Sequence, residues 1–118
     1  MIPWFGAGMT TGVYDIPVAH VNVHNIVTNT VPVDAYRGAG RPEAAYLIER
    51  LVDKAARTLN IPGPELRRRN FIRADQFPYQ AATGRVYDSG DYERLMDSAL
   101  SRADWASFEQ RRAESAAR

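Results

Sequence analysis

The first third of the chain differs from the rest in how hydrophobic and polar positions alternate. Residues 14–30 are rich in valine, isoleucine and threonine, and apolar and polar side chains partly alternate along them. Such alternation predicts one or two β-strands, the first of which Pro17 restricts to a sheet edge or a late start. Residues 1–12 contain three glycines and are predicted to form a loop.

From Pro42 onward, the apolar residues recur at helical spacing instead. Apolar side chains between Ile48 and Leu59 fall on one face of a helix, and charged side chains fill the other face. Pro42 suits the first turn of this helix, and Glu43 suits the positive end of its dipole. The stretch "NIPGP" predicts where the helix ends, and Pro64 opens a second, shorter helix.

The last third of the chain predicts a hairpin and two more helices. Residues 79–88 have the pattern of a small β-hairpin that turns at Thr83 and Gly84. Ser89 suits the N-cap of a third helix, and residues 104–117 predict a last helical stretch. The predicted fold class is therefore α+β, with short N-terminal strands followed by mainly helices.

The positions of the charged residues along the chain are more informative than the net charge. Asp15 and Asp34 are the only charged side chains in the first 36 residues, whereas charged residues are frequent from Arg37 onward. An apolar segment without charges is typical of strands that are covered on more than one face. The remaining residues offer few apolar surfaces for this purpose, so we expect the chain to be part of a larger body or to need a partner.

The totals exclude several classes of function. The net charge of +1 gives no reason to expect a nucleic-acid partner. The sequence contains no cysteine, which excludes disulfides, a cysteine nucleophile and thiolate metal sites within these residues. No apolar run reaches the roughly 18 residues of a membrane span. The first residues lack the basic region of a secretory signal, and we expect a cytoplasmic protein.

The sequence Arg-Gly-Ala-Gly-Arg at residues 37–41 is a candidate anion site at a helix entrance. Glycines allow a turn whose backbone N–H groups form a concave nest, and the helix N-terminus adds its dipole. Arg37 and Arg41 could add forked donors. A dinucleotide fingerprint would need a third glycine at Glu43, and the Gly-Lys-Ser/Thr of a phosphate loop is absent. A tight turn without any ligand has the same pattern and stays open as the alternative.

Other candidate sites carry weaker signals. His20 and His24 would share one face of a strand and could bind a metal, but no third ligand has compatible spacing, so a polar strand face is favoured. Residues 67–69 are three arginines that point about 100° apart on a helix and cannot form one phosphate-binding face. We expect one of them to pair internally and the others to be solvated. Asp88, Asp91 and Glu93 lack the spacing of a calcium loop and suit helix capping.

Five motifs occur together in the order "YDIP", "TNT", "AYRGAGRPE", "ELRRRN" and "TGRVYDSGDY". In this combination the chain, from about Gly8 to Leu100, resembles the large, molybdenum-cofactor-binding subunit of the xanthine dehydrogenase, aldehyde oxidase and aerobic carbon-monoxide dehydrogenase family. The resemblance implies that residues 1–118 are an internal part of a larger molybdopterin-binding domain. It also implies oxidative hydroxylation of an aldehyde or N-heterocycle, with water as the oxygen source.

The resemblance also implies where the cofactor lies. The arginine matching Arg37 lies at the molybdenum centre in relatives, and the backbone at Gly38 and Ala39 faces the same cavity. Gly40 and Arg41 complete the expected cofactor-binding set.

Two departures from the family pattern bear on the substrate. The carbon-monoxide enzymes have a cysteine that holds copper where this chain has Gly38. The purine enzymes have a phenylalanine where this chain has Ala39, which cannot stack on a ring. Their substrate-binding arginine falls on Phe5. We therefore expect Phe5 and Ala39 to line the substrate pocket, and carbon monoxide and purines to be poor substrates.

The resemblance places other parts of the enzyme outside these residues. The general-base glutamate is expected elsewhere, so we expect neither a catalytic residue nor a direct metal ligand here. Expected partners are the remainder of the large subunit, subunits carrying iron–sulfur clusters and FAD, and a small-molecule substrate. The isolated chain should be inactive. Two alternatives stay open, a non-catalytic helical interaction module and a phosphate- or nucleotide-binding domain built on the turn at residues 37–41.

Overall fold

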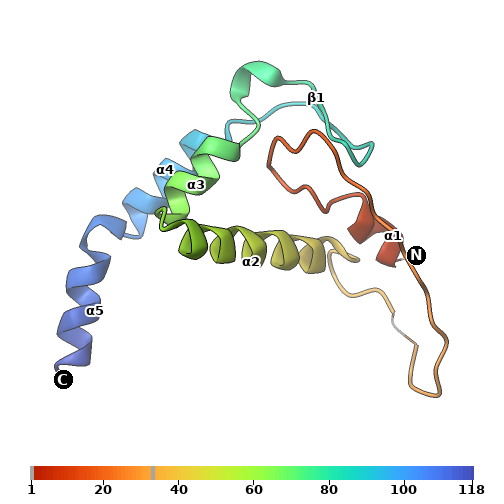
Figure 1. Ribbon diagram of the computed structural model, residues 1–118, viewed down its shortest axis with the longest axis horizontal. Helices are drawn as coiled ribbons and strands as arrows, with labels where there is room; N and C mark the ends of the chain where they lie inside the picture. Colours follow the sequence, from red (N-terminus) through yellow and green to blue (C-terminus); the bar gives the residue numbers. More distant parts are fainter. Residues whose placement is uncertain (1, 33) are drawn as a thin grey trace.

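The computed structural model describes residues 2–32 and 34–118. Met1, Val33 and the side chain of Ile2 lie outside the described part. The longest helix is α2 (Arg41–Leu59), against which α3 (Gly63–Asn70) packs (Figure 1). Asn60 ends α2 in the left-handed conformation and donates its N–H to the carbonyls of Ala56 and Arg57. Both predicted helices are confirmed.

The C-terminal part is also helical, as predicted. The short 3-10 helix η1 (Ala74–Gln76) follows α3; α4 (Tyr92–Arg102), η2 (Trp105–Ser107) and α5 (Phe108–Ala116) complete the chain. Figure 1 shows α3 and α4 side by side and α5 leading away from them. None of the helices within the described residues is long and apolar enough to cross a membrane.

Of the residues predicted to cap α4, Asp91 is confirmed and Ser89 is wrong. Asp91 is the N-cap residue, and its Oδ1 accepts the N–H of Arg94 at 3.0 Å. Ser89 instead donates its hydroxyl to the carboxylate of Asp88. An aspartate directly before the first helical turn places its carboxylate on the free N–H groups, which a serine two residues earlier cannot reach.

The hairpin is confirmed and is the only sheet among the described residues. Strands β1 (Tyr79–Gln80) and β2 (Val86–Tyr87) pair antiparallel, with Tyr79 opposite Tyr87. The turn closes through the N–H of Ala81, which donates to the Arg85 carbonyl at 2.8 Å. The fold is therefore mostly helical with one two-stranded sheet, which lies in the C-terminal half and not at the N-terminus.

The N-terminal predictions are wrong in two respects. A short helix, α1 (Ile2–Ala7), replaces part of the predicted loop and packs against the start of α2. Residues 16–32, here called the extended segment, form no strand, because no second strand lies beside them among the described residues. The predicted strand region makes a single bridge, between Tyr14 and Phe71.

A small core lies where residues 11–15 cross α2 and α3. Tyr14 and Ile72 are fully buried, together with small side chains from α2 and the hairpin. The Tyr14 ring stacks on Phe71 at a centroid distance of 5.7 Å, and Phe71 contacts Tyr92 of α4. Aromatic contacts thus connect the N-terminal segment to the helices.

A polar network holds the same elements together. The Tyr14 hydroxyl donates to Glu49 at 2.8 Å, and Arg67 donates to Glu49 at 2.9 Å and to Asp53 at 2.8 Å. Burial raises the pKa of Tyr14, and its hydrogen bond to Glu49 adds to the shift. The hydrogen bond from Arg67 lowers the pKa of Asp53. This network joins the segment after α1 to both α2 and α3.

The expectation that only one of the three arginines pairs is wrong. Besides Arg67, Arg68 bridges to α4 through Glu93, with Nη1 at 2.6 Å from Oε1, and also contacts Asp97. Arg69 pairs with Glu65 within α3 at 2.7 Å. The side chains point in different directions, as predicted. Each pairs with acidic side chains of a different helix: α2 for Arg67, α4 for Arg68 and α3 itself for Arg69.

Candidate functional site

The turn that leads into α2 has a left-handed backbone at three consecutive residues. The angle φ is 96°, 45° and 91° along residues 38–40. Ala39 donates its N–H to the Tyr36 carbonyl at 2.8 Å, and Arg41 donates its N–H to the Gly38 carbonyl at 3.1 Å. Two of the N–H groups that the sequence suggested for an anion nest are therefore used to close the turn itself.

Helix α1 supports this turn from one side. An ideal Cβ built at Gly6 would lie 2.9 Å from the carbonyl oxygen of Gly40, so only a glycine allows this approach. The Arg41 guanidinium carbon lies 5.2 Å from the centroid of the Phe5 ring, a cation–π contact. Arg41 also donates Nη1–H to the Gly38 carbonyl at 3.2 Å. The structure thus brings Phe5, predicted for the substrate pocket, to the predicted cofactor turn.

The two arginines of the turn differ in their surroundings. Arg41 is held by Phe5 and by the backbone of the turn. Arg37 is exposed, and among residues 2–32 and 34–118 no acidic side chain forms an ion pair with it. A guanidinium without a partner keeps its forked donors available for an anionic group.

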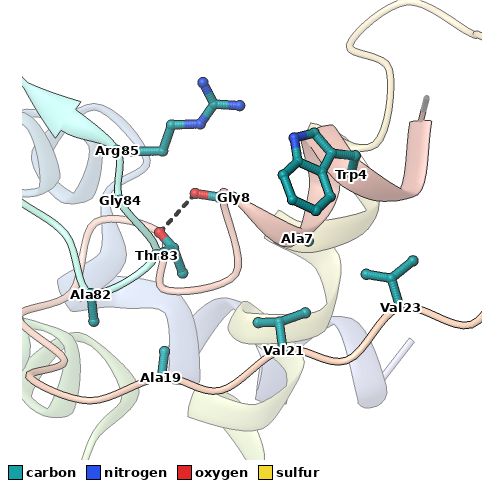
Figure 2. Close-up of a pocket in the computed structure, with 10 residues that line it drawn as sticks. All are labelled: Trp4, Ala7, Gly8, Ala19, Val21, Val23, Ala82, Thr83, Gly84 and Arg85. Carbon is teal, nitrogen blue, oxygen red and sulfur yellow. Dashed lines mark hydrogen bonds between the residues drawn. The ribbon is translucent and has the colours of Figure 1, made fainter.

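A separate cavity of about 380 Å³ lies between α1, the extended segment and the hairpin turn (Figure 2). The Arg85 guanidinium and the Trp4 indole stand along one side, and Val21 and Val23 along the other. Thr83 closes one end by donating its hydroxyl to the Gly8 carbonyl at 2.8 Å. None of the ten residues that line this cavity belongs to the turn at residues 37–41.

The weaker candidate, a metal site at the histidines, is not assembled. His20 and His24 are both exposed on the extended segment. Within the described part of the chain, no group of three or more histidine, cysteine, aspartate or glutamate side chains could hold a metal ion. The two histidines therefore belong to the polar positions of the extended segment.

The family model of the molybdopterin cofactor-binding domain matches residues 1–71, which is more than half of the chain. The chain belongs to this family. Its match includes α1, the extended segment, the turn, α2 and α3. The family resemblance inferred from the five motifs is confirmed. It favours a segment of a molybdopterin-binding subunit over an interaction module or a nucleotide-binding turn.

Similar proteins agree with this assignment. The carbon monoxide dehydrogenase large chain of Hydrogenophaga pseudoflava is 46% identical and aligns with 97% of this chain and 14% of its own length. A solved Cu,Mo-CO dehydrogenase is 42% identical, with a TM-score of 0.79 over 94% of this chain and 14% of that one. Quinoline 2-oxidoreductase from Pseudomonas putida 86 is 31% identical, with a TM-score of 0.81 over 98% and 15%. This member of the family thus spans about a seventh of the length of these relatives.

The residues present fit molybdopterin but do not fit copper. Arg37 offers a cation that has no acidic partner within the described part of the chain, beside a turn whose N-terminal neighbours are almost uncharged, which suits an anionic cofactor. A copper ion held by a thiolate at this turn would need a cysteine, and the chain has none. In addition, an ideal Cβ at Gly38 would lie 2.6 Å from both Cδ and Cγ of Pro42.

Two structural residues of the turn were missed from sequence. Gly6 belongs to the predicted loop, and no local signal reveals that it touches a residue 34 positions further along. Pro42 was predicted only as a helix-opening residue. The contact of its ring with a Cβ at position 38 depends on the positive φ of Gly38, which the sequence does not reveal.

Proposed function

We propose that this chain forms one wall of the molybdopterin cavity in the large subunit of a molybdenum hydroxylase. The observation that supports this most is the left-handed turn at residues 38–40, flanked by an arginine without an acidic partner among the described residues. Residues 1–118 would then be part of one molybdopterin-binding domain. The complete enzyme would oxidise an aldehyde or an N-heterocycle, with the oxygen supplied by water.

The two arginines would divide the work of the turn. Arg37 would donate hydrogen bonds to the bound cofactor, and the backbone of Gly38 and Ala39 would line the cavity beside it. Gly40 and Arg41 would keep the turn in shape, since they contact α1 and the Gly38 carbonyl. When bound, the molybdenum cofactor supplies the two-electron oxidation chemistry, which no residue of this chain could provide.

The proposed substrate class follows from the small residues at positions 38 and 39. Gly38 cannot hold copper, so carbon monoxide is excluded as the main substrate in this proposal, although a Cu,Mo-CO dehydrogenase is among the similar structures. Ala39 cannot stack on a purine. Ala39 and Phe5 would border the substrate, and the relative named quinoline 2-oxidoreductase supports an N-heterocycle as one class.

The extended segment supports the assignment to a larger subunit. Val18, Ile26 and Val27 are 81%, 82% and 97% exposed, although such side chains are normally covered in strands. We propose that the remainder of the large subunit covers them. Electrons would leave through iron–sulfur clusters and FAD on other domains or subunits of a cytoplasmic enzyme, and the isolated chain would be inactive.

A chimeric large subunit tests this proposal. The matching stretch of the Hydrogenophaga pseudoflava carbon monoxide dehydrogenase large chain is replaced by this chain, which aligns over 97% of its length. We expect the assembled chimera to contain molybdopterin and to reduce a dye with an aldehyde or quinoline, but to lose carbon monoxide oxidation. Undiminished carbon monoxide oxidation, or an assembled subunit without cofactor, would contradict the proposal. The unmodified large chain is the control.

A further inference from the structure

The space beside Gly38 is filled by a residue outside the turn itself. An ideal Cβ at Gly38 would lie 2.6 Å from Cδ and from Cγ of Pro42, and real Cβ atoms essentially never approach another heavy atom below 3.0 Å. Pro42 sits in the first turn of α2, where its ring is fixed by the helix. The ring cannot swing away as a flexible side chain would.

The backbone adds a second, separate restriction. At Gly38, φ is 96°, a conformation that side chains of L-residues rarely adopt. Gly84 in the hairpin turn has a similar φ of 84°, but an ideal Cβ there meets nothing within 4 Å. A side chain would therefore strain the backbone at either glycine, but only at Gly38 would it also clash with a neighbouring residue.

We infer that Pro42 is a specificity-determining residue, because its ring occupies the space that any side chain at position 38 would need. Pro42 acts on the reaction only through position 38, which makes it a positioning residue. Its effect is to keep position 38 free of a side chain. A cysteine, and therefore a copper ion, cannot be accommodated there while Pro42 is present.

The consequence for substrate class rests on the proposed function. In that proposal, a glycine at position 38 means that this turn supplies no copper ligand to the cavity. A single change of Gly38 to cysteine would not create a copper site, because the clash with Pro42 would displace the turn. A copper site at this turn would therefore require changes at both position 38 and position 42.

A double-mutant cycle on the 118-residue chain tests the inference without any cofactor. The thermal midpoint is measured for Gly38→Ala, Pro42→Ala, the double variant and Gly84→Ala, which serves as the control for backbone strain alone. We expect Gly84→Ala to lower the midpoint by about 4 °C and Gly38→Ala by about 10 °C or more. Pro42→Ala alone should change it by only about 2 °C.

The decisive comparison is the double variant. With Pro42 replaced, the Gly38→Ala change should cost only about as much as Gly84→Ala, since the strain remains and the clash is gone. If Gly38→Ala does not fold but the double variant does, the inference is supported equally. If Gly38→Ala costs the same with and without the proline, the inference is overturned. This outcome would leave the proposed cofactor role untouched, because that role is measured by cofactor content in the chimera.

Discussion

Two regions of the molecule differ in how their side chains find partners. One is the helical frame, formed by α2, α3 and α4, and the other is the extended segment over residues 16–32. In the frame, charged side chains pair across elements, as Arg67 does with α2 and Arg68 with α4. The extended segment has no Asp, Glu, Lys or Arg, no strand partner among the described residues and large apolar side chains in solvent. Figure 1 shows it running out from the body before it returns to α2.

This difference indicates which part of the chain needs other polypeptide in the proposed subunit. Ion pairs and the Tyr14 network join α2, α3 and α4 through residues of this chain alone. The frame also exposes large apolar side chains, among them Leu47 at 55% and Leu95 at 68%. A strand needs hydrogen-bonding neighbours and a covering layer, and the extended segment has neither among the described residues. A chain that spans about a seventh of its relatives' length leaves ample polypeptide to supply them in a complete subunit.

The largest expected effect is on the frame. Replacing Arg67 by alanine leaves Glu49 and Asp53 without their shared cation and should lower the free energy of unfolding by about 2 kcal/mol. Urea denaturation measures this change. Arg57→Ala on the exposed side of α2 is the matched control and should change stability by less than about 0.5 kcal/mol. Equal effects of the two variants would show that the network does not hold the frame.

A smaller effect is expected where α1 meets the turn. Gly6→Ala would place a Cβ 2.9 Å from the Gly40 carbonyl oxygen, so α1 must shift, at a cost of about 1–2 kcal/mol. Gly63→Ala is the control, because its Cβ would meet only the flexible end of Arg67. Amide hydrogen exchange should show faster exchange at Ala39 and Arg41 in Gly6→Ala. Unchanged exchange there would mean that α1 does not support the turn.

The pH dependence of the frame should follow Asp53. The hydrogen bond from Arg67 lowers its pKa below 3.8, the unfolded value. A lowered folded pKa adds stability above the unfolded pKa, and this stability is lost as the pH falls through the folded value. Asp53→Asn should therefore reduce the loss of stability between about pH 5 and pH 2. Asp88→Asn is the control, and an equal reduction there would remove the Arg67–Asp53 pair as the cause.

The smallest effect is expected in the extended segment. Val27 is 97% exposed, so Val27→Asp should change the stability of the chain by less than about 0.5 kcal/mol. In the chimeric large subunit the same variant should impair assembly, because a charge would be buried under the covering polypeptide. Normal assembly of that variant would show that this part of the segment stays uncovered, which would remove the contrast between the two regions.

Local patterns were enough to predict the helical frame, and long-range contacts explain most errors. Pro42 and the apolar spacing after it predicted α2, and the Thr83-Gly84 turn predicted the hairpin. The strands expected over residues 14–30 depend on partners that local sequence cannot reveal. Apolar alternation by itself does not fix the conformation of the chain, because strand formation depends on neighbours and burial.

The candidate site was predicted by the resemblance more than by local pattern. Residues 37–41 were marked by their glycines and arginines, and Phe5 by its alignment with relatives. The contact between Phe5 and Arg41 could not be foreseen, because α1 itself was not predicted. The clash that Pro42 imposes on position 38 needs the φ of Gly38, which only the structure supplies.

The most direct test of the central claim is the molybdenum content of the assembled chimeric large subunit with Arg37 replaced by alanine. If Arg37 holds the cofactor, the molybdenum per subunit should fall by roughly tenfold, in the range seen when outer contacts of a metal site are removed. Arg102→Ala, at an exposed arginine of α4, should leave it unchanged. Full molybdenum content in a correctly assembled Arg37→Ala subunit would contradict the claim.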